Sequence, residues 1–299
     1  MLFELGGPRP PLYYASLGGL ASSVQALLNK GADVNAQGGH YGNALQAASS
    51  GGHEKVVQML LDKGANVNAQ GGFYGDALQA ASLGGHEKVV QMLVDNGANV
   101  NAQGGDALQL ALSRGHEKVV QILLDNGANV NTQGGDYGNV LQAASSKGYE
   151  RVVQMLLDNG ANVNAQDGYY GNALQLASLR GHEKVVQVLL DNGANVNAQG
   201  GDHGNALQAA SSRGYEKVVQ ILLDNGANVN TQGGLYGDAL QAASSRGYKK
   251  VVQMLLDNGA NVNAQGGLYG DALQAASLRG YEKVVQMLLD NGATLDVMG

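Results

Sequence analysis

The sequence predicts an all-α solenoid, in which about nine copies of one short unit stack on one another. The first reason is repetition: residues 71–103 read GGFYGDALQAASLGGHEKVVQMLVDNGANVNAQ, and the chain on either side repeats this text with few changes. The second is that each full copy carries the start and stop signals of two short helices. The third is a Gly- and Asn-rich segment between copies, which favours a projecting β-turn or hairpin. Apart from the shorter fourth copy, the copies recur every 33 residues. A period of this length is typical of solenoid proteins, whose units bury surface only against their neighbours.

The repeats cover nearly the whole chain, and a uniform array has no interior boundary, so we expect a single domain over residues 1–299. The fourth copy is shorter than the others because it reads GGDALQ where they read GGxYGNALQ or GGxYGDALQ. The approximate copies are 5–37, 38–70, 71–103, 104–133, 134–166, 167–199, 200–232, 233–265 and 266–299.

The first helix of each copy is expected to start after an Asn or Asp, whose side chain can accept a hydrogen bond from the first turn. It runs through LQAAS and should end at a glycine in the left-handed conformation. The capping residues are Asn43, Asp76, Asp106, Asn139, Asn172, Asn205, Asp238 and Asp271. The glycines are Gly52, Gly85, Gly115, Gly148, Gly181, Gly214, Gly247 and Gly280.

The second helix, HEKVVQMLLDNG in most copies, places apolar residues on one face at helical spacing. In residues 38–70 this face comprises Val56, Val57, Leu60 and Leu61. Neither helix is long enough to be stable alone, so each pair depends on its neighbour.

The two ends of the array differ. Residues 5–37 carry polar Ser23 where later copies have a core valine, which is typical of a capping unit, and Pro11 suits a first helical position. The last copy keeps Val284, Val285 and Leu289 without such replacements. We therefore expect weak end-to-end self-association, or a continuation of the array in a longer protein.

Composition argues against several classes of partner. With 18 basic and 25 acidic residues the formal charge is −7, which disfavours a nucleic-acid surface. No cysteine is available for disulfides or thiolate metal sites, and no apolar run is long enough to cross a membrane. We expect no membrane contact and an intracellular location, cytoplasmic by default, with the nucleus left open.

No motif predicts catalysis, a cofactor or a metal. His53, His86, His116 and His182 share one position, but tyrosine replaces them in other copies and neighbours lie a whole repeat apart, so a structural role is expected. The recurring serines lack a histidine and carboxylate constellation, and no P-loop of the form GxxxxGK[ST] occurs. We expect a protein that is not an enzyme.

The GHEKVVQMLL and GANVN stretches of the 33-residue unit resemble the ankyrin repeat, whose pattern includes T-P-L-H-x-A and G-H-x-x-V-V-x-L-L-L-x-x-G-A-D-V-N. The resemblance implies a helix-turn-helix and finger unit that binds proteins along a concave face. Here T-P-L-H is replaced by N-A-L-Q or D-A-L-Q, so Gln46 and its equivalents should take over the family's cross-repeat hydrogen bonds. The YGNALQAAS and GHEKVVQMLLDNGANVNAQGG stretches also look like the C-terminal arrays of fungal NACHT/STAND proteins, which are NLR-like sensors. A consensus-designed ankyrin is the alternative origin.

A protein partner is the expected ligand, and a structural spacer or self-assembling rod is the alternative. The residue at the tip of each finger varies between copies while the buried positions scarcely change, which favours recognition. For the tyrosine beside it, burial under the next finger is the alternative. The predicted partner-binding residues are His40, Tyr41, Phe73, Tyr74, Asp136, Tyr137, Tyr169, Tyr170, Asp202, His203, Leu235, Tyr236, Leu268 and Tyr269.

A basic residue precedes the glycine between the two helices in the later copies. These positions are Arg114, Lys147, Arg180, Arg213, Arg246 and Arg279. The two interpretations are a linear surface for an anionic partner and cations placed beside helix C-termini, where they stabilise the helix dipole.

Overall fold

The computed structural model describes residues 10–102, 106–132, 138–166 and 171–294. In these ranges the secondary structure consists of eighteen α-helices and isolated β-bridges, with no longer strand, as the all-α solenoid prediction requires. The chain forms two compact units, an N-terminal unit, Met1–Thr132, and a C-terminal unit, Gln133–Gly299. That the whole chain behaves as one domain stays a prediction.

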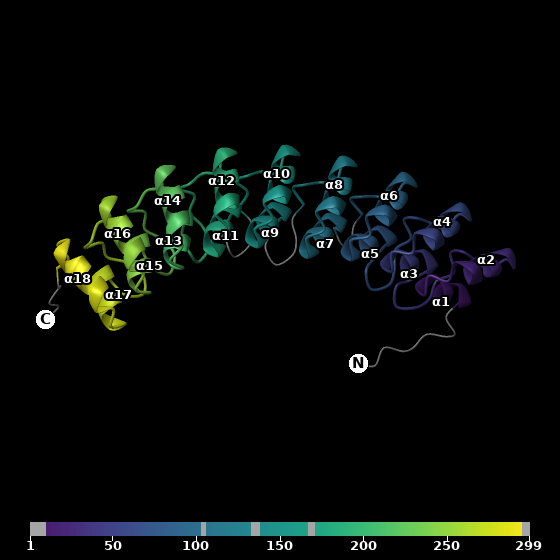
Figure 1. The fold of residues 1–299 in the computed structure, drawn as a ribbon, viewed down its shortest axis with the longest axis horizontal. Coiled ribbons are helices and arrows are strands. Elements are labelled where there is room, and N and C mark those ends of the chain that lie inside the picture. Colours follow the sequence, from purple (N-terminus) through teal and green to yellow (C-terminus); the bar gives the residue numbers. More distant parts are fainter. Residues whose placement is uncertain (1–9, 103–105, 133–137, 167–170, 295–299) are drawn as a thin grey trace. The chain divides into compact units, whose positions relative to one another are not determined.

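Within each unit the helices form consecutive pairs (Figure 1). The N-terminal unit contains α1 (Pro11–Leu17), α2 (Ala21–Asn29), α3 (Ala44–Ser50), α4 (Glu54–Asp62), α5 (Ala77–Gly84), α6 (Glu87–Asp95), α7 (Ala107–Arg114) and α8 (Glu117–Asp125). The C-terminal unit contains α9 (Val140–Lys147), α10 (Glu150–Asp158), α11 (Ala173–Arg180), α12 (Glu183–Asp191), α13 (Ala206–Ser211), α14 (Glu216–Asp224), α15 (Ala239–Ser244), α16 (Lys249–Asp257), α17 (Ala272–Leu278) and α18 (Glu282–Asp290). First helices pack on first helices, as α3 does on α5, and second helices pack on second helices, as α4 does on α6.

The first helices begin and end as their sequence predicts. Asn43 Oδ1 accepts a hydrogen bond from the Gln46 amide at 2.9 Å, and each of the seven other predicted caps accepts one from its own helix. The glycines after these helices all have φ between 67° and 75°. Some helices end before that glycine, as α13 does at Ser211, but the left-handed turn is kept.

The second helices bury one face in the solenoid. Val56, Val57 and Leu60 of α4 are fully buried, as predicted, whereas Leu61 is only half-buried. In the first copy Ser23 is exposed, in agreement with a polar outer face at that end.

Each finger is a tight hairpin closed by two glycines. The Gly71 amide donates to the Gly75 carbonyl at 2.7 Å, and the same bond joins the glycines of the other described fingers, 38 to 42, 200 to 204, 233 to 237 and 266 to 270. Successive fingers approach so closely that a Cβ atom on Gly72 would lie 2.2 Å from the Tyr41 carbonyl carbon. Gly72 also has a positive φ of 67°, so a glycine is required there on both grounds.

A row of buried glutamines joins neighbouring repeats. Gln175 Nε2 donates to the carbonyls of Ala198, Gly200 and Gly204 in the next finger, at 3.3, 3.1 and 2.9 Å. Equivalent donors to the next finger are Gln46, Gln142, Gln208 and Gln241. The prediction that glutamine replaces the histidine of T-P-L-H as the cross-repeat group is confirmed at these positions.

An asparagine ladder, which the sequence analysis did not identify, forms a second connection. Asn197 Oδ1 accepts from the Asn228 amide at 2.8 Å, and its Nδ2 donates to the Gly226 carbonyl at 3.2 Å. The same pair of bonds recurs from Asn35 to Asn101 in the N-terminal unit and from Asn164 to Asn263 in the C-terminal unit.

Candidate partner-binding surface

The fingertip is the pair of residues before the last glycine of each hairpin, such as Phe73-Tyr74 in GGFYG. In the N-terminal unit the Phe73 amide donates to the His40 carbonyl at 2.9 Å, so the two tips are joined through their backbones. The His40 and Phe73 rings stack with centroids 4.9 Å apart, and the Tyr41 and Tyr74 rings stack at 5.6 Å. Edge contacts within each tip complete a cluster of four rings. These tips therefore form one continuous aromatic surface.

The variable residue and the tyrosine of a tip have different environments. Phe73 is 69% exposed, and His40 is also exposed, whereas Tyr41 and Tyr74 are half-buried. The Tyr41 amide donates to the hydroxyl of Tyr13, a buried residue at the glutamine position of the first repeat. The tyrosines thus support the tip, and the variable residues face solvent.

The described fingertips of the C-terminal unit are also joined to one another. The Leu235 amide donates to the Asp202 carbonyl at 2.9 Å, and the Leu268 amide donates to the Leu235 carbonyl at 3.1 Å. Leu235 is 47% exposed and Leu268 is 66% exposed, while Asp202 is half-buried. The His203 and Tyr236 rings stack at 6.4 Å. Apolar side chains are therefore held in solvent by a fixed backbone.

Arginines from the ends of the first helices reach these fingertips. Arg246 Nη2 donates to the Tyr236 hydroxyl at 3.0 Å, and Arg279 Nη2 donates to the Tyr269 hydroxyl at 2.9 Å. The Arg279 guanidinium also lies 5.6 Å from the centre of the Tyr269 ring. The basic row therefore belongs to the fingertip surface here, a contact that the sequence conceals because the two residues are ten positions apart.

His203 differs from the tyrosine that other fingertips have. Its pKa is lowered, first by burial and then by the positive charge of Arg213, and the carboxylate of Asp202 opposes this shift. The ring is therefore neutral at physiological pH.

Four predicted site residues, Asp136, Tyr137, Tyr169 and Tyr170, lie outside the described residues. The structure brings the other ten together as two sets, one in each unit. Their role in binding stays a prediction.

The recurring histidines connect repeats. Nε2 of His86 donates to the Ser50 carbonyl at 3.0 Å, and the ring packs on Gly52, where an added Cβ atom would lie 2.5 Å from Nδ1. Tyr215, Tyr248 and Tyr281 pack in the same way on the glycine of the preceding repeat. Among the described residues, no three His, Cys, Asp or Glu side chains are grouped to hold a metal ion.

The recurring serines of the first helices are equally unsuited to chemistry. Ser49, Ser82, Ser145 and Ser211 are fully buried, so their hydroxyls cannot meet a substrate in this fold.

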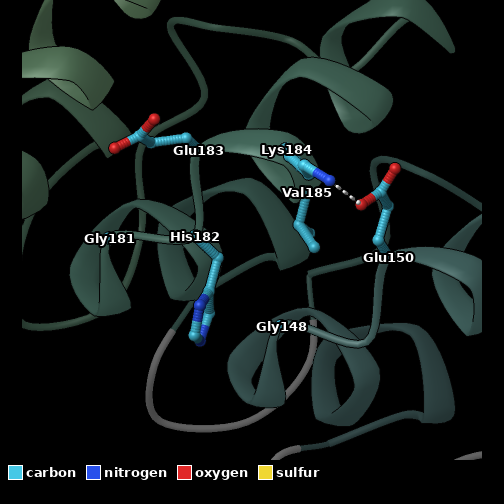
Figure 2. A pocket seen from close by; sticks show the side chains of 7 residues that line it. All are labelled: Gly148, Glu150, Gly181, His182, Glu183, Lys184 and Val185. Atoms are coloured by element: carbon cyan, nitrogen blue, oxygen red, sulfur yellow. Dashed lines mark ion pairs between the residues drawn. The ribbon is translucent and has the colours of Figure 1, made fainter.

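An open depression of about 280 Å³ lies between the starts of α10 and α12 (Figure 2). Lys184 Nζ forms an ion pair with Glu150 Oε2 at 3.3 Å beside it, and Figure 2 shows the side chains of His182 and Glu183 pointing apart. This arrangement brings no nucleophile and base together.

None of the described helices has the length and apolar character required to cross a membrane.

Comparison with known proteins identifies the family. The family described as "Ankyrin repeats (3 copies)" matches residues 70–134, 140–233 and 229–298, and "Ankyrin repeats (many copies)" matches 12–61 and 44–94. No curated protein matches the chain. Among solved structures, the human ASB11 ankyrin repeat domain is similar, with 27% sequence identity and a TM-score of 0.66 over 74% of this chain and 99% of that one. The repeated helix pairs, the glycine-closed fingers and these matches together show that the chain belongs to the ankyrin repeat family.

Proposed function

We propose that the chain is a non-catalytic module that binds a protein partner through its fingertips and the concave face of the first helices beside them. Ankyrin repeat domains generally mediate protein–protein interaction and are typically not enzymes. The observation that carries the proposal is the exposure of Phe73, Leu235 and Leu268 on fingertips with a fixed backbone. Apolar side chains in solvent on a fixed backbone favour association, because little loop ordering opposes their burial.

The exposed side chains of the described second helices are mostly polar; Leu289 of the last copy, 41% exposed, is an exception. Lys88 pairs with Glu54 across repeats, and Gln58 donates to Asp62 within one helix; both contacts recur along the array. These polar pairs are nearly the same in every repeat, whereas the fingertips vary. A spacer or self-assembling rod, the alternative function, has no need of varied and apolar fingertips.

We further propose that this module is the recognition array of an NLR-like sensor in the cytoplasm. The resemblance of YGNALQAAS and GHEKVVQMLLDNGANVNAQGG to the arrays of fungal NACHT/STAND proteins supports this role.

The test compares three forms of the complete chain in crosslinking and affinity capture from cell extract, followed by calorimetry with each purified partner. The fingertip variant carries Phe73→Ser, Leu235→Ser and Leu268→Ser. A control carries Lys55→Ser, Gln220→Ser and Gln253→Ser, at exposed positions of second helices. We expect the fingertip variant to lose affinity by at least about tenfold, the effect of a lost hot spot, and the control to bind like the natural chain. Equal binding by all three forms would contradict the proposal.

A further inference from the structure

We propose that the fingertips of the C-terminal unit bind an acidic segment of a partner protein, in which Asp or Glu residues alternate with leucine-sized apolar side chains. This inference rests on the proposed function and specifies the chemistry of its partner. The site is the arginine–leucine surface, defined here as Leu235, Leu268, Arg246 and Arg279 with their supporting tyrosines Tyr236 and Tyr269.

The guanidinium groups of this surface are exposed and oriented. Arg246 and Arg279 each donate one hydrogen bond to the tyrosine hydroxyl of their own repeat, which fixes where the side chain lies. A guanidinium group carries five N–H donors, so several remain for a carboxylate, which it can bind through two parallel hydrogen bonds. Arg213 and Arg180 continue the exposed row at the same position of the preceding repeats. In the first three repeats this position is glycine, at Gly18, Gly51 and Gly84.

The nearby acidic residues do not neutralise this row. Glu216 follows Arg213 by three residues, but its carboxylate pairs with Lys250 of the next repeat at 3.3 Å. Glu150 and Glu183 are paired with lysines in the same way. Among the described residues, no carboxylate lies within ion-pair distance of Arg180, Arg213, Arg246 or Arg279.

One substitution in the repeat adds a further cation three residues after Arg246. Lys249 stands where the other full repeats have glutamate, so the position that would face Lys283 carries a positive charge. Arg246, Lys249 and Lys250 therefore form a local group of exposed cations, although the chain as a whole has a charge of −7. A local positive potential on an acidic protein selects acidic partners, because the remaining surface does not attract them.

Apolar side chains lie next to these cations. Leu235 and Leu268 are largely exposed, and Leu278, directly before Arg279, is 73% exposed. A polyanion such as single-stranded nucleic acid would leave these leucines unburied, and it binds best where aromatic rings are free to stack. Tyr236 and Tyr269 are half-buried and hydrogen-bonded to the arginines. The combination favours a protein segment over a nucleic acid.

The experiment selects binders from a random peptide display library against the complete chain. We expect the selected peptides to be enriched in Asp, Glu and large apolar residues and depleted of Lys and Arg. The double variant Arg246→Gln, Arg279→Gln should abolish the acidic enrichment. The variant Arg114→Gln should keep it, since Arg114 is exposed at the same position of a repeat without the YG fingertip. Thermal unfolding of each variant checks that the fold is retained.

Fluorescence anisotropy with one selected peptide then gives the magnitude. We expect about a tenfold weaker affinity for the double variant, the effect of two lost charge contacts at an interface, and a comparable loss for Leu268→Ser. Selected peptides without acidic enrichment, or acidic peptides that bind the double variant equally well, would overturn the inference. So would single-stranded DNA that binds as tightly as the peptide and is unaffected by Leu268→Ser.

The two proposals fail in different ways. Selection that depends on the fingertips Phe73, Leu235 and Leu268 but not on the arginines would leave the proposed function intact and refute the acidic partner. Selection and capture that depend on neither set would refute the proposed function itself.

Discussion

At the scale of the residue, Gln175 shows how one side chain can hold two repeats together. Its Nε2 group donates to carbonyls of the following finger, while its Oε1 atom accepts from the Asn172 amide at 2.6 Å. The Gln175 amide in turn donates to Asn172 Oδ1, which completes a capping box. A single buried amide therefore satisfies the start of its own helix and the backbone of its neighbour.

Replacing this glutamine should be costly. We expect Gln175→Leu to lower the free energy of unfolding by about 1–3 kcal/mol, because the finger carbonyls and the Asn172 amide lose a buried partner. Chemical denaturation measures the change. Gln220→Leu, at an exposed position of a second helix, is the control and should change stability little. If the two substitutions have the same small effect, the glutamine row does not connect the repeats.

Asp238 predicts a dependence of stability on pH. Burial raises the pKa of this carboxyl from 3.8 to about 6, although the Gln241 and Leu240 amides that donate to it act in the opposite direction. The pKa of Asp238 is higher in the folded state than in the unfolded state, so protonation of this carboxyl stabilises the folded state. The stabilisation is complete below pH 3.8 and is lost as the pH rises through about 6. Asn205 performs the same capping role without a charge.

We therefore expect Asp238→Asn to stabilise the chain near neutral pH, by on the order of 1–3 kcal/mol. The advantage over the natural chain should disappear at a pH below 3.8. Thermal unfolding of both proteins across this range checks the sign. An advantage that is the same at every pH would show that ionisation of Asp238 does not control it.

At the scale of the element, the parts that depend on local sequence could be predicted. The cap at Asn43 and the left-handed turn at Gly52 involve residues within one helix and its end, so the pattern was sufficient. The contact from Arg246 to Tyr236 and the bond from Asn228 to Asn197 could not be found in this way. The first requires the finger to be folded against the helices of its own repeat, and the second requires two repeats to be packed together. In the sequence, Asn197 cannot be told apart from an ordinary turn residue, because Asn is common in turns.

The asparagine ladder should contribute measurably to the connection between repeats. We expect Asn197→Ala to cost about 1 kcal/mol, the typical value of a hydrogen bond in a folded protein, and to speed hydrogen exchange at the Asn228 amide. Asn192→Ala is the matched control, because Asn192 donates only to the Val188 carbonyl of its own helix. An Asn228 amide equally protected in both variants would contradict a role for the ladder.

At the scale of the whole molecule, the two units carry fingertips of different chemistry. The described tips of the N-terminal unit form a cluster of aromatic rings, whereas the tips at Leu235 and Leu268 in the C-terminal unit combine leucines with arginines. The repeat pattern predicted both rows, because every finger occupies the same place in its copy. It did not predict which tips would be stacked and which exposed, since that depends on the neighbouring tip in space.

The two ends of the chain also differ, and the difference predicts how the molecules associate. In the first copy Ser22 and Ser23 are exposed, whereas in the last copy Leu278 and Leu289 are 73% and 41% exposed. Because a terminal repeat with an apolar outer surface lacks the polar cap that such arrays need for solubility, we expect weak self-association through the last copy.

Light scattering over a range of concentrations should show an apparent mass that rises with concentration. The double variant Leu278→Lys, Leu289→Lys should remain monomeric, because charged side chains would have to be buried in the contact. The control Leu20→Lys alters an exposed leucine of the first copy and should associate like the natural chain. A natural chain that stays monomeric at high concentration would contradict the prediction, and loss of association in the Leu20 variant would place the contact at the other end.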